Sequence, residues 1–360
     1  MTINRTARRL RMALATLVLI APSPIAIARD GGLRESSGRE NGAKVVRQKR
    51  ADLVREARLV EETRRKFASP DAVLAWVNGY RLEPEPEKIG EAVKAMARLG
   101  MFDEPERAGV FFGFLGGVIA DRQVEAKELI ATFFPLRPEH QLGVIRAIAA
   151  SGLPEWKDLL GHFAERMPAR GGLITQYLTG KLKPLWERKI EESPEVLDSL
   201  WGFYFATGSH LPVVRIITAL PLAADKNSLE KLTVGSMAKW TLATNAQREK
   251  DLLDLARAEM RHQPKAVQKE LAEVIQAAEN FETAKLRKAA VGAIDQLRTK
   301  GPEAARTWVW WGTAAQTAIA VGCVALSVAG VPQAGIPCIV GGAVATGATR
   351  LIAPTFGAQQ

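Results

Sequence analysis

The chain has 360 residues, of which 47% are hydrophobic and 24% are charged, and its formal net charge is +10. Most of the excess positive charge lies near the N-terminus, because residues 67–360 hold 33 basic and 32 acidic side chains. The body is therefore close to neutral, and nucleic acid is not an expected partner. Only two cysteines are present, which excludes a disulfide framework as the source of stability.

Residues 1–28 have the pattern of an export signal. Four arginines precede a short apolar stretch, Met12 to Ala21. Ala26 and Ala28 supply the small-x-small pattern of a signal peptidase site, which predicts cleavage after Ala28. An uncleaved signal anchor is the alternative, but this apolar stretch is about half of the roughly 20 residues that a bilayer span needs. The body is thus expected to be periplasmic or otherwise extracytoplasmic.

Two charged segments follow the signal. Residues 29–43 combine Gly, Ser and charge with almost no bulky apolar residue, which predicts a disordered linker. Residues 44–68 are predicted to form an amphipathic charged helix, because one apolar residue recurs every seven positions from Val46 to Phe67. This stripe is sparse for a coiled coil, so packing onto the following domain is favoured. The basic tail of residues 29–66 could also contact anionic lipid or cell-wall polymer.

Residues 69–301 are predicted to form an α-helical, repeat-like domain of segments about 10 to 18 residues long, separated by Pro and Gly. A proline next to a polar cap predicts a helix start, and a glycine after a polar residue predicts a helix end. The starts are Ser69-Pro70, Ser193-Pro194 and Gln263-Pro264, and the ends are Ser151-Gly152, Thr207-Gly208 and Lys300-Gly301.

The expected fold is all-α. SPDAVLAW at 69–76 and SPEVLDSLW at 193–201 share a Ser-Pro-acid start and a Trp about two turns later. Helices that pair at spacings of about 30 to 36 residues suit stacked hairpins. We therefore expect an α-solenoid-like array of helical hairpins, similar in architecture to HEAT or tetratricopeptide repeats although it matches neither consensus. A compact, non-repetitive helical domain is the alternative.

Residues 302–353 carry the strongest membrane signal, ahead of a tail at 354–360. The 43 residues from Thr307 to Thr349 contain no Asp, Glu, Lys, Arg or His. Gly312 to Val331 has about the length of a span, a Pro/Gly turn follows, and Cys338 to Ala348 forms a shorter apolar arm. Aromatic residues suited to the membrane interface and small residues suited to helix contacts mark this segment. They are Trp308, Trp310, Trp311, Gly322, Gly330 and Gly347.

Three geometries remain open for this run. It could span the bilayer once, return as a helical hairpin, or pack as an apolar hairpin within a soluble protein. Ten alanines, seven glycines and a single leucine among the 43 residues weaken the insertion signal. Pairing of Cys323 with Cys338 is disfavoured because the two lie at different depths of the predicted segment.

No pattern of catalytic, cofactor-binding or metal-binding residues stands out. A G-x-G motif, a Walker A loop, G-x-S-x-G and H-E-x-x-H are all absent from the sequence. His162 and Glu165 could share a helix face, but such pairs are ordinary. Trp156 and Trp186 could hold a ligand by stacking, although partly buried packing is favoured for both. We therefore expect no catalytic residue, no cofactor and no metal.

One enzyme family offers a partial resemblance. Glu35-Ser36 and Glu192-Ser193 resemble the catalytic Glu-Ser of soluble lytic transglycosylases, and residues 172–176 are loosely similar to that family's Gly-Leu-Met-Gln. The resemblance implies a carboxylic acid acting on a glycan. Three departures count against it: Glu35 lies in the predicted linker, Ser193 suits a helix cap, and the Gln is shifted by one residue.

These features favour an exported, membrane-anchored helical scaffold that binds a protein or envelope polymer and touches the lipid bilayer. One alternative is an envelope glycan hydrolase or lyase with dispersed carboxylates. Another is a membrane-active protein that acts through its C-terminal hairpin.

Overall fold

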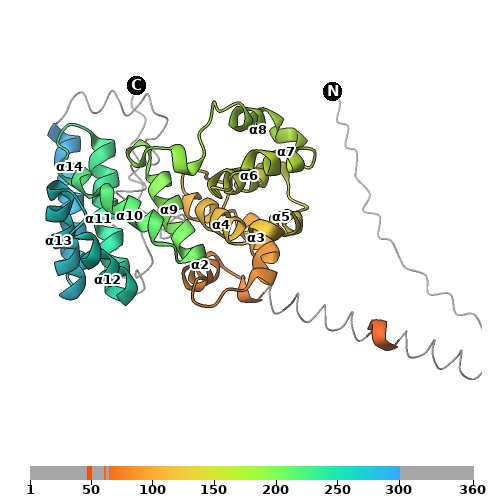
Figure 1. The fold of residues 1–360 in the computed structure, drawn as a ribbon, viewed down its shortest axis with the longest axis horizontal. Helices are drawn as coiled ribbons and strands as arrows, with labels where there is room; N and C mark the ends of the chain where they lie inside the picture. The colour runs from red at the N-terminus through yellow and green to blue at the C-terminus, as the bar shows by residue number, and fades with distance from the viewer. Residues whose placement is uncertain (1–46, 51–60, 62–64, 301–360) are drawn as a thin grey trace, which may run out of the picture. The chain divides into compact units, whose positions relative to one another are not determined.

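The computed structural model describes residues 47–50, 61 and 65–300 (Figure 1). Every regular element in these ranges is a helix, which confirms the predicted all-α class. The chain divides into two units at residue 58, and residues 47–50 of the first unit are helical. The helices between residues 65 and 300 all belong to the second unit.

The α-helices of the second unit have the following bounds. They are α2 (Pro70–Gly79), α3 (Ile89–Arg98), α4 (Gly109–Asp121), α5 (Ala126–Phe133), α6 (Gln141–Ala150), α7 (Trp156–Ala164), α8 (Gly171–Leu178), α9 (Pro194–Thr207), α10 (His210–Thr218), α11 (Leu229–Arg248), α12 (Lys250–Glu259), α13 (Lys265–Glu279) and α14 (Thr283–Lys300). Short 3₁₀ helices join several of them: η1 (Pro86–Lys88), η2 (Gln123–Glu125), η3 (Pro138–His140), η4 (Pro168–Arg170), η5 (Leu185–Glu187), η6 (Ile190–Glu192) and η7 (Leu220–Ala224).

The predicted helix boundaries are largely confirmed. Ser69 and Ser193 cap α2 and α9, and each hydroxyl accepts a hydrogen bond from a backbone N–H of the first turn, at 3.2 and 3.0 Å. Gly208 ends α9 in the left-handed conformation, at φ 66°. The predicted start at Pro264 is one residue early, because α13 begins at Lys265 and Pro264 occupies the cap position.

The crossing of α4 and α9 lies at the centre of the core. The two helices approach so closely that a Cβ on Gly113 would lie 1.8 Å from the carbonyl oxygen of Ser199. A Cβ on Gly202 would lie 1.9 Å from the carbonyl oxygen of Val110. Only glycine permits this backbone contact. The spacing of four between Gly109, Gly113 and Gly117 is the sequence signal for this close packing.

Aromatic residues fill the core beside this crossing. Trp76 packs edge-to-face on Phe67, Tyr80 and Phe114, with ring centroids 5.0 to 5.5 Å apart. Trp201 is fully buried, and its indole N–H donates to the Thr241 hydroxyl at 3.0 Å. Phe67 is the last residue of the stripe predicted for 44–68, so at this residue the segment does pack onto the following domain.

The pairs of helices that pack together bear on the predicted solenoid. Sequence neighbours pair, as in α6 with α7 and α7 with α8, which suits hairpins. However, α4 packs against α9, and α2 also packs against α9, across long stretches of sequence. A regular solenoid joins each repeat only to its neighbours. The all-α class is therefore established, and the solenoid-like array stays a prediction.

Several predicted segments lie outside the described residues. They are the signal with Ala26 and Ala28, the linker 29–43, most of 44–68, both cysteines, the membrane segment 302–353 with Trp308, Trp310, Trp311, Gly322, Gly330 and Gly347, and the tail 354–360. Within the described ranges, no helix combines the length and the apolar character that a membrane crossing requires. The most apolar one, α4, has only 13 residues.

Candidate functional site

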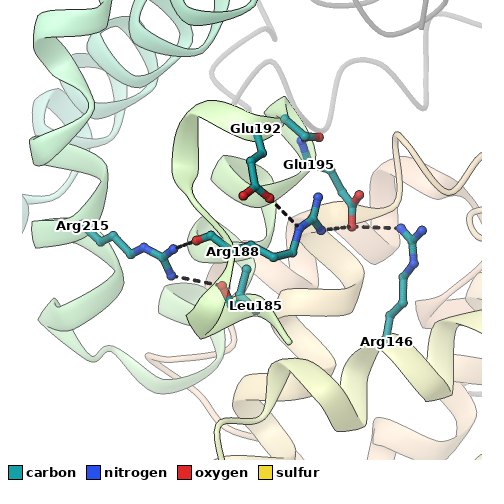
Figure 2. Close-up of polar contacts among 7 residues, drawn as sticks. Arg146, Leu185, Arg188, Glu192, Glu195 and Arg215 are labelled. Carbon is teal, nitrogen blue, oxygen red and sulfur yellow. Dashed lines mark hydrogen bonds and ion pairs between the residues drawn. The ribbon is translucent and has the colours of Figure 1, made fainter. Parts of the chain in front are cut away.

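A cluster of arginines surrounds one buried carboxylate at the start of α9. Glu195 is 8% exposed, and its Oε1 accepts hydrogen bonds from Arg146 at 2.9 Å and from Arg188 at 3.2 Å. Figure 2 shows this carboxylate between the two guanidinium groups. We call the set of Arg146, Arg188, Glu192, Glu195 and Arg215 the Glu195 cluster.

The local sequence explains the position of Glu195. Ser193 and Pro194 start α9, so Glu195 lies in the first turn, where the free N–H groups of the helix favour a negative charge. Arg146 comes from α6, and Arg188 comes from the extended backbone between η5 and η6. The ion pairs therefore connect the loop that leads into α9 to a helix from an earlier part of the chain.

Arg215 of α10 completes the cluster in a different way. Its guanidinium donates to the carbonyl oxygens of Leu185, at 3.1 Å, and of Arg188 (Figure 2). Burial lowers the pKa of Arg215. Since this arginine binds carbonyls, it fixes the backbone of residues 185–188 while its positive charge is not neutralised by a bound carboxylate.

The chemistry available to the Glu195 cluster is electrostatic. Two guanidinium groups, those of Arg146 and Arg188, bind Glu195, and Arg188 also lies 3.8 Å from the second carboxylate, Glu192. Glu195 is held by two charge-assisted hydrogen bonds, from Arg146 and Arg188, which is the arrangement of a structural ion pair. Burial raises the pKa of the neighbouring Tyr177, so this phenol does not act as a base near neutral pH. The cluster can fix a loop and attract anions.

A strongly basic stretch of chain precedes α9 and includes Arg188 of this cluster. Residues 166–189, which we call the α8 basic segment, contain six Lys or Arg side chains and one acidic residue, Glu187. The basic residues are Arg166, Arg170, Lys181, Lys183, Arg188 and Lys189. The three lysines are exposed and make no ion pair with any residue that the structure describes. The segment therefore presents positive charge to solvent.

The two remaining arginines of the segment are also not bound to carboxylates. Arg166 lies over the rings of Phe134 and Phe163, 5.7 and 5.6 Å from their centroids. Arg170 donates to the carbonyl oxygens of Pro138, at 2.9 Å, and Glu139, at 3.3 Å. Both side chains are thus oriented by contacts that leave their charge in place.

A pair of carboxylates elsewhere in the fold bears on the hydrolase alternative. Glu249 and Asp251 both accept from the Tyr204 hydroxyl at 3.2 Å, and Arg81 forms ion pairs with both carboxylates, at 3.1 Å to Asp251. Burial raises the pKa of Tyr204, and the nearby Glu249 adds to this effect. One arginine bridges the two acids, so the pair serves to connect the end of α2, α9 and α12. It does not resemble an acid and a base facing a substrate.

Four candidate residues from the sequence are held by packing, capping or an ion pair within the fold: Trp156, Trp186, Glu192 and Ser193. Trp156 is buried, and the half-buried Trp186 donates its indole N–H to the carbonyl oxygen of Ala150 at 3.1 Å, so both pack against the core. Ser193 caps α9, as its sequence context favours, and Glu192 pairs with Arg188. Among the described residues, no group of three or more His, Cys, Asp or Glu side chains is placed to hold a metal ion.

Sequence reasoning missed the Glu195 cluster and the α8 basic segment for different reasons. A charge count in short windows would have found the segment, whereas the sum over residues 67–360 concealed it. The pairing of Arg146 with Glu195 joins residues 49 positions apart, and no local pattern indicates it.

Comparison with known proteins adds no family to this description. No protein-family model, no curated protein and no solved structure matches the chain.

Proposed function

We propose that this protein is an exported, membrane-anchored helical scaffold of the cell envelope that binds a protein partner and catalyses no reaction of its own. The observation that carries the proposal is which charged side chains of the described residues form ion pairs and which do not. The carboxylates of its buried clusters are bound to arginine or lysine, as at Glu195 and Glu249, while the α8 basic segment keeps exposed cations without acidic partners. This distribution suits binding better than acid–base catalysis.

The two ends of the chain supply the location in this proposal. The Arg-rich, apolar and small-x-small pattern of residues 1–28 supports export. The charge-free run from Thr307 to Thr349 supports attachment to the bilayer, behind a helical body that would then face the envelope space. The helices of that body pack on a continuous core, which gives a rigid support for a binding surface.

Fractionation tests the location. The full-length protein and a version that ends at Gly301 are expressed in parallel, and membranes are washed with alkaline carbonate. We expect the full-length protein to stay with the membrane and the shortened one to wash off. If both wash off equally, the anchor is wrong.

Partner capture tests the binding function. Full-length protein is crosslinked in intact cells, solubilised and purified, and the captured proteins are identified. A reproducible partner is expected, together with no turnover of purified cell-wall glycan. Turnover of the glycan without any reproducible partner would replace the scaffold with the hydrolase alternative.

A further inference from the structure

We propose that the α8 basic segment, residues 166–189, is the docking surface for an acidic segment of the partner protein, in which Asp and Glu are interspersed with apolar side chains. This inference rests on the proposed scaffold function and names the chemistry of its partner. Three features of the segment carry it: exposed lysines without an ion pair among the described residues, partly buried apolar side chains, and a fixed backbone.

The first feature is charge that the fold does not use. Lys181, Lys183 and Lys189 are exposed and make no ion pair with the residues that the structure describes. Arg166 and Arg170 are oriented by rings and carbonyls, so they too keep their charge. An acidic ligand offers opposite charge to these side chains and is steered toward them as it associates.

The second feature is apolar surface among these cations. Leu173, Leu178, Leu182 and Trp186 all lie within residues 166–189, and each is only partly buried as it packs against the core. A purely anionic ligand, such as a phosphate polymer, would not cover the exposed part of these side chains. A peptide that carries both carboxylates and apolar side chains matches cations and apolar surface together.

The third feature is a backbone that is already in place. Arg215 holds the carbonyls of residues 185 and 188, and the Trp186 indole binds the carbonyl of Ala150. At the other end, Arg170 binds the carbonyls of Pro138 and Glu139. Binding therefore requires the ordering of lysine side chains but not of the loop itself, which lowers its entropic cost.

Titration of labelled peptides into the full-length protein in detergent tests the inference. The probe is a short peptide in which Glu and Asp alternate with Leu and Phe, and its control has Gln and Asn in place of the acids. The test variant is Lys181→Gln, Lys183→Gln and Lys189→Gln together. The matched control variant is Lys250→Gln, Lys265→Gln and Lys269→Gln, which changes three equally exposed lysines of α12 and α13.

We expect the acidic peptide to bind, the neutral peptide not to bind, and added salt to weaken the interaction. The test variant should weaken binding about ten-fold, whereas the control variant should stay within about two-fold of the unchanged protein. Equal losses in the two variants, or no binding of the acidic peptide, would overturn the inference.

Two further probes separate the peptide from other anions. Phosphatidylglycerol vesicles and inorganic polyphosphate are offered to the same proteins. If either binds through Lys181, Lys183 and Lys189 more tightly than the peptide does, the surface recognises lipid or phosphate and the proposed peptide is wrong.

Crosslinking of the test variant in cells separates this inference from the scaffold function on which it rests. Undiminished capture of the same partner would place docking elsewhere and leave the scaffold intact. Failure of the unchanged protein to capture any partner would remove the scaffold function itself.

Discussion

The α8 basic segment and the helices α11 to α13 differ in how many of their lysines form ion pairs between helices. In the second region, Lys239 of α11 binds Glu270 and Glu273 of α13 at 2.7 and 2.6 Å, and Arg257 of α12 binds Glu279 of α13 at 2.7 Å. These ion pairs connect one helix to the next, although the exposed Lys250, Lys265 and Lys269 of the same region form none with the described residues. In the first region the exposed lysines connect nothing that the structure describes.

The local composition follows the same division. Residues 229–279, which span α11 to α13, hold eight acidic and eight basic side chains, and residues 166–189 hold one acidic and six basic side chains. A balanced set of charges can be paired within its own region, whereas an excess of one sign needs partners from elsewhere, as Arg188 finds in Glu195. The near-neutral sum over residues 67–360 therefore conceals a local difference, because one region is balanced in charge and the other carries a positive excess.

The largest expected effect on stability concerns the crossing of α4 and α9 at the centre of the core. Gly113→Ala places a methyl group 1.8 Å from the carbonyl oxygen of Ser199, so α4 and α9 must separate. We expect a loss of about 3 kcal/mol or more in the free energy of unfolding, because overpacking against backbone cannot be relieved by a rotamer change. Urea unfolding of the full-length protein, followed by circular dichroism, measures it.

The control for this substitution is Gly161→Ala, in α7. No atom lies within 4 Å of the added methyl group, so the unfolding free energy should stay the same or rise by up to about 1 kcal/mol. If Gly113→Ala is tolerated equally well, α4 and α9 are not in backbone contact, and their close crossing is wrong.

A second prediction concerns the paired charges directly. Burial acts to lower the pKa of Lys239, but hydrogen bonds from its ammonium group to Glu270 and Glu273 outweigh this and raise it. Lys239→Met leaves the buried Glu270 without a cation and should cost about 2 to 3 kcal/mol of unfolding free energy. Thermal unfolding of the full-length protein provides the measurement.

Lys183→Met in the α8 basic segment is the matched change for Lys239→Met. It removes no ion pair within the described residues, so its effect should fall within about 0.5 kcal/mol. Equal effects of the two substitutions would abolish the distinction between the two regions.

A third prediction concerns the pH dependence of stability at Glu85. This carboxylate forms ion pairs, as Glu270 and Glu273 do in the second region. Burial acts to raise the pKa of Glu85, but hydrogen bonds from Lys66, Lys88 and Trp76 outweigh it and lower the pKa from 4.5 to about 2. A lowered pKa means that this stabilisation is complete above pH 4.5 and is lost as the pH falls toward about 2. The loss should be on the order of 1 to 2 kcal/mol, because the group is partly screened by solvent.

Glu85→Gln should flatten the dependence of unfolding free energy on pH between about 2 and 4.5. Glu83→Gln, at an exposed neighbouring position, should leave that dependence unchanged. An identical pH profile for Glu85→Gln and the unchanged protein would show that Glu85 is not held as an ion-paired carboxylate.

The sequence predicted the helical class and most of the tested boundaries, because these depend on local signals such as Ser69 before Pro70 and Gly208 after Thr207. The packing order was not predictable from such signals. The contact of Gly113 with Ser199 and the ion pair of Arg146 with Glu195 depend on which helices meet. The α8 basic segment was present in the sequence, but only the structure showed that its lysines have no acidic partner among the described residues.

The smallest expected effect concerns the stability of the triple lysine variant that is also used to test binding. Lys181→Gln, Lys183→Gln and Lys189→Gln remove three like charges that the described fold does not use, so the melting temperature should stay within about 2 °C or rise slightly. The rise, if present, should disappear at high salt, where the repulsion is screened in both proteins. Differential scanning calorimetry at low and high salt measures it. A fall of several degrees would mean that these lysines stabilise the fold, and the α8 basic segment would then belong with α11 to α13.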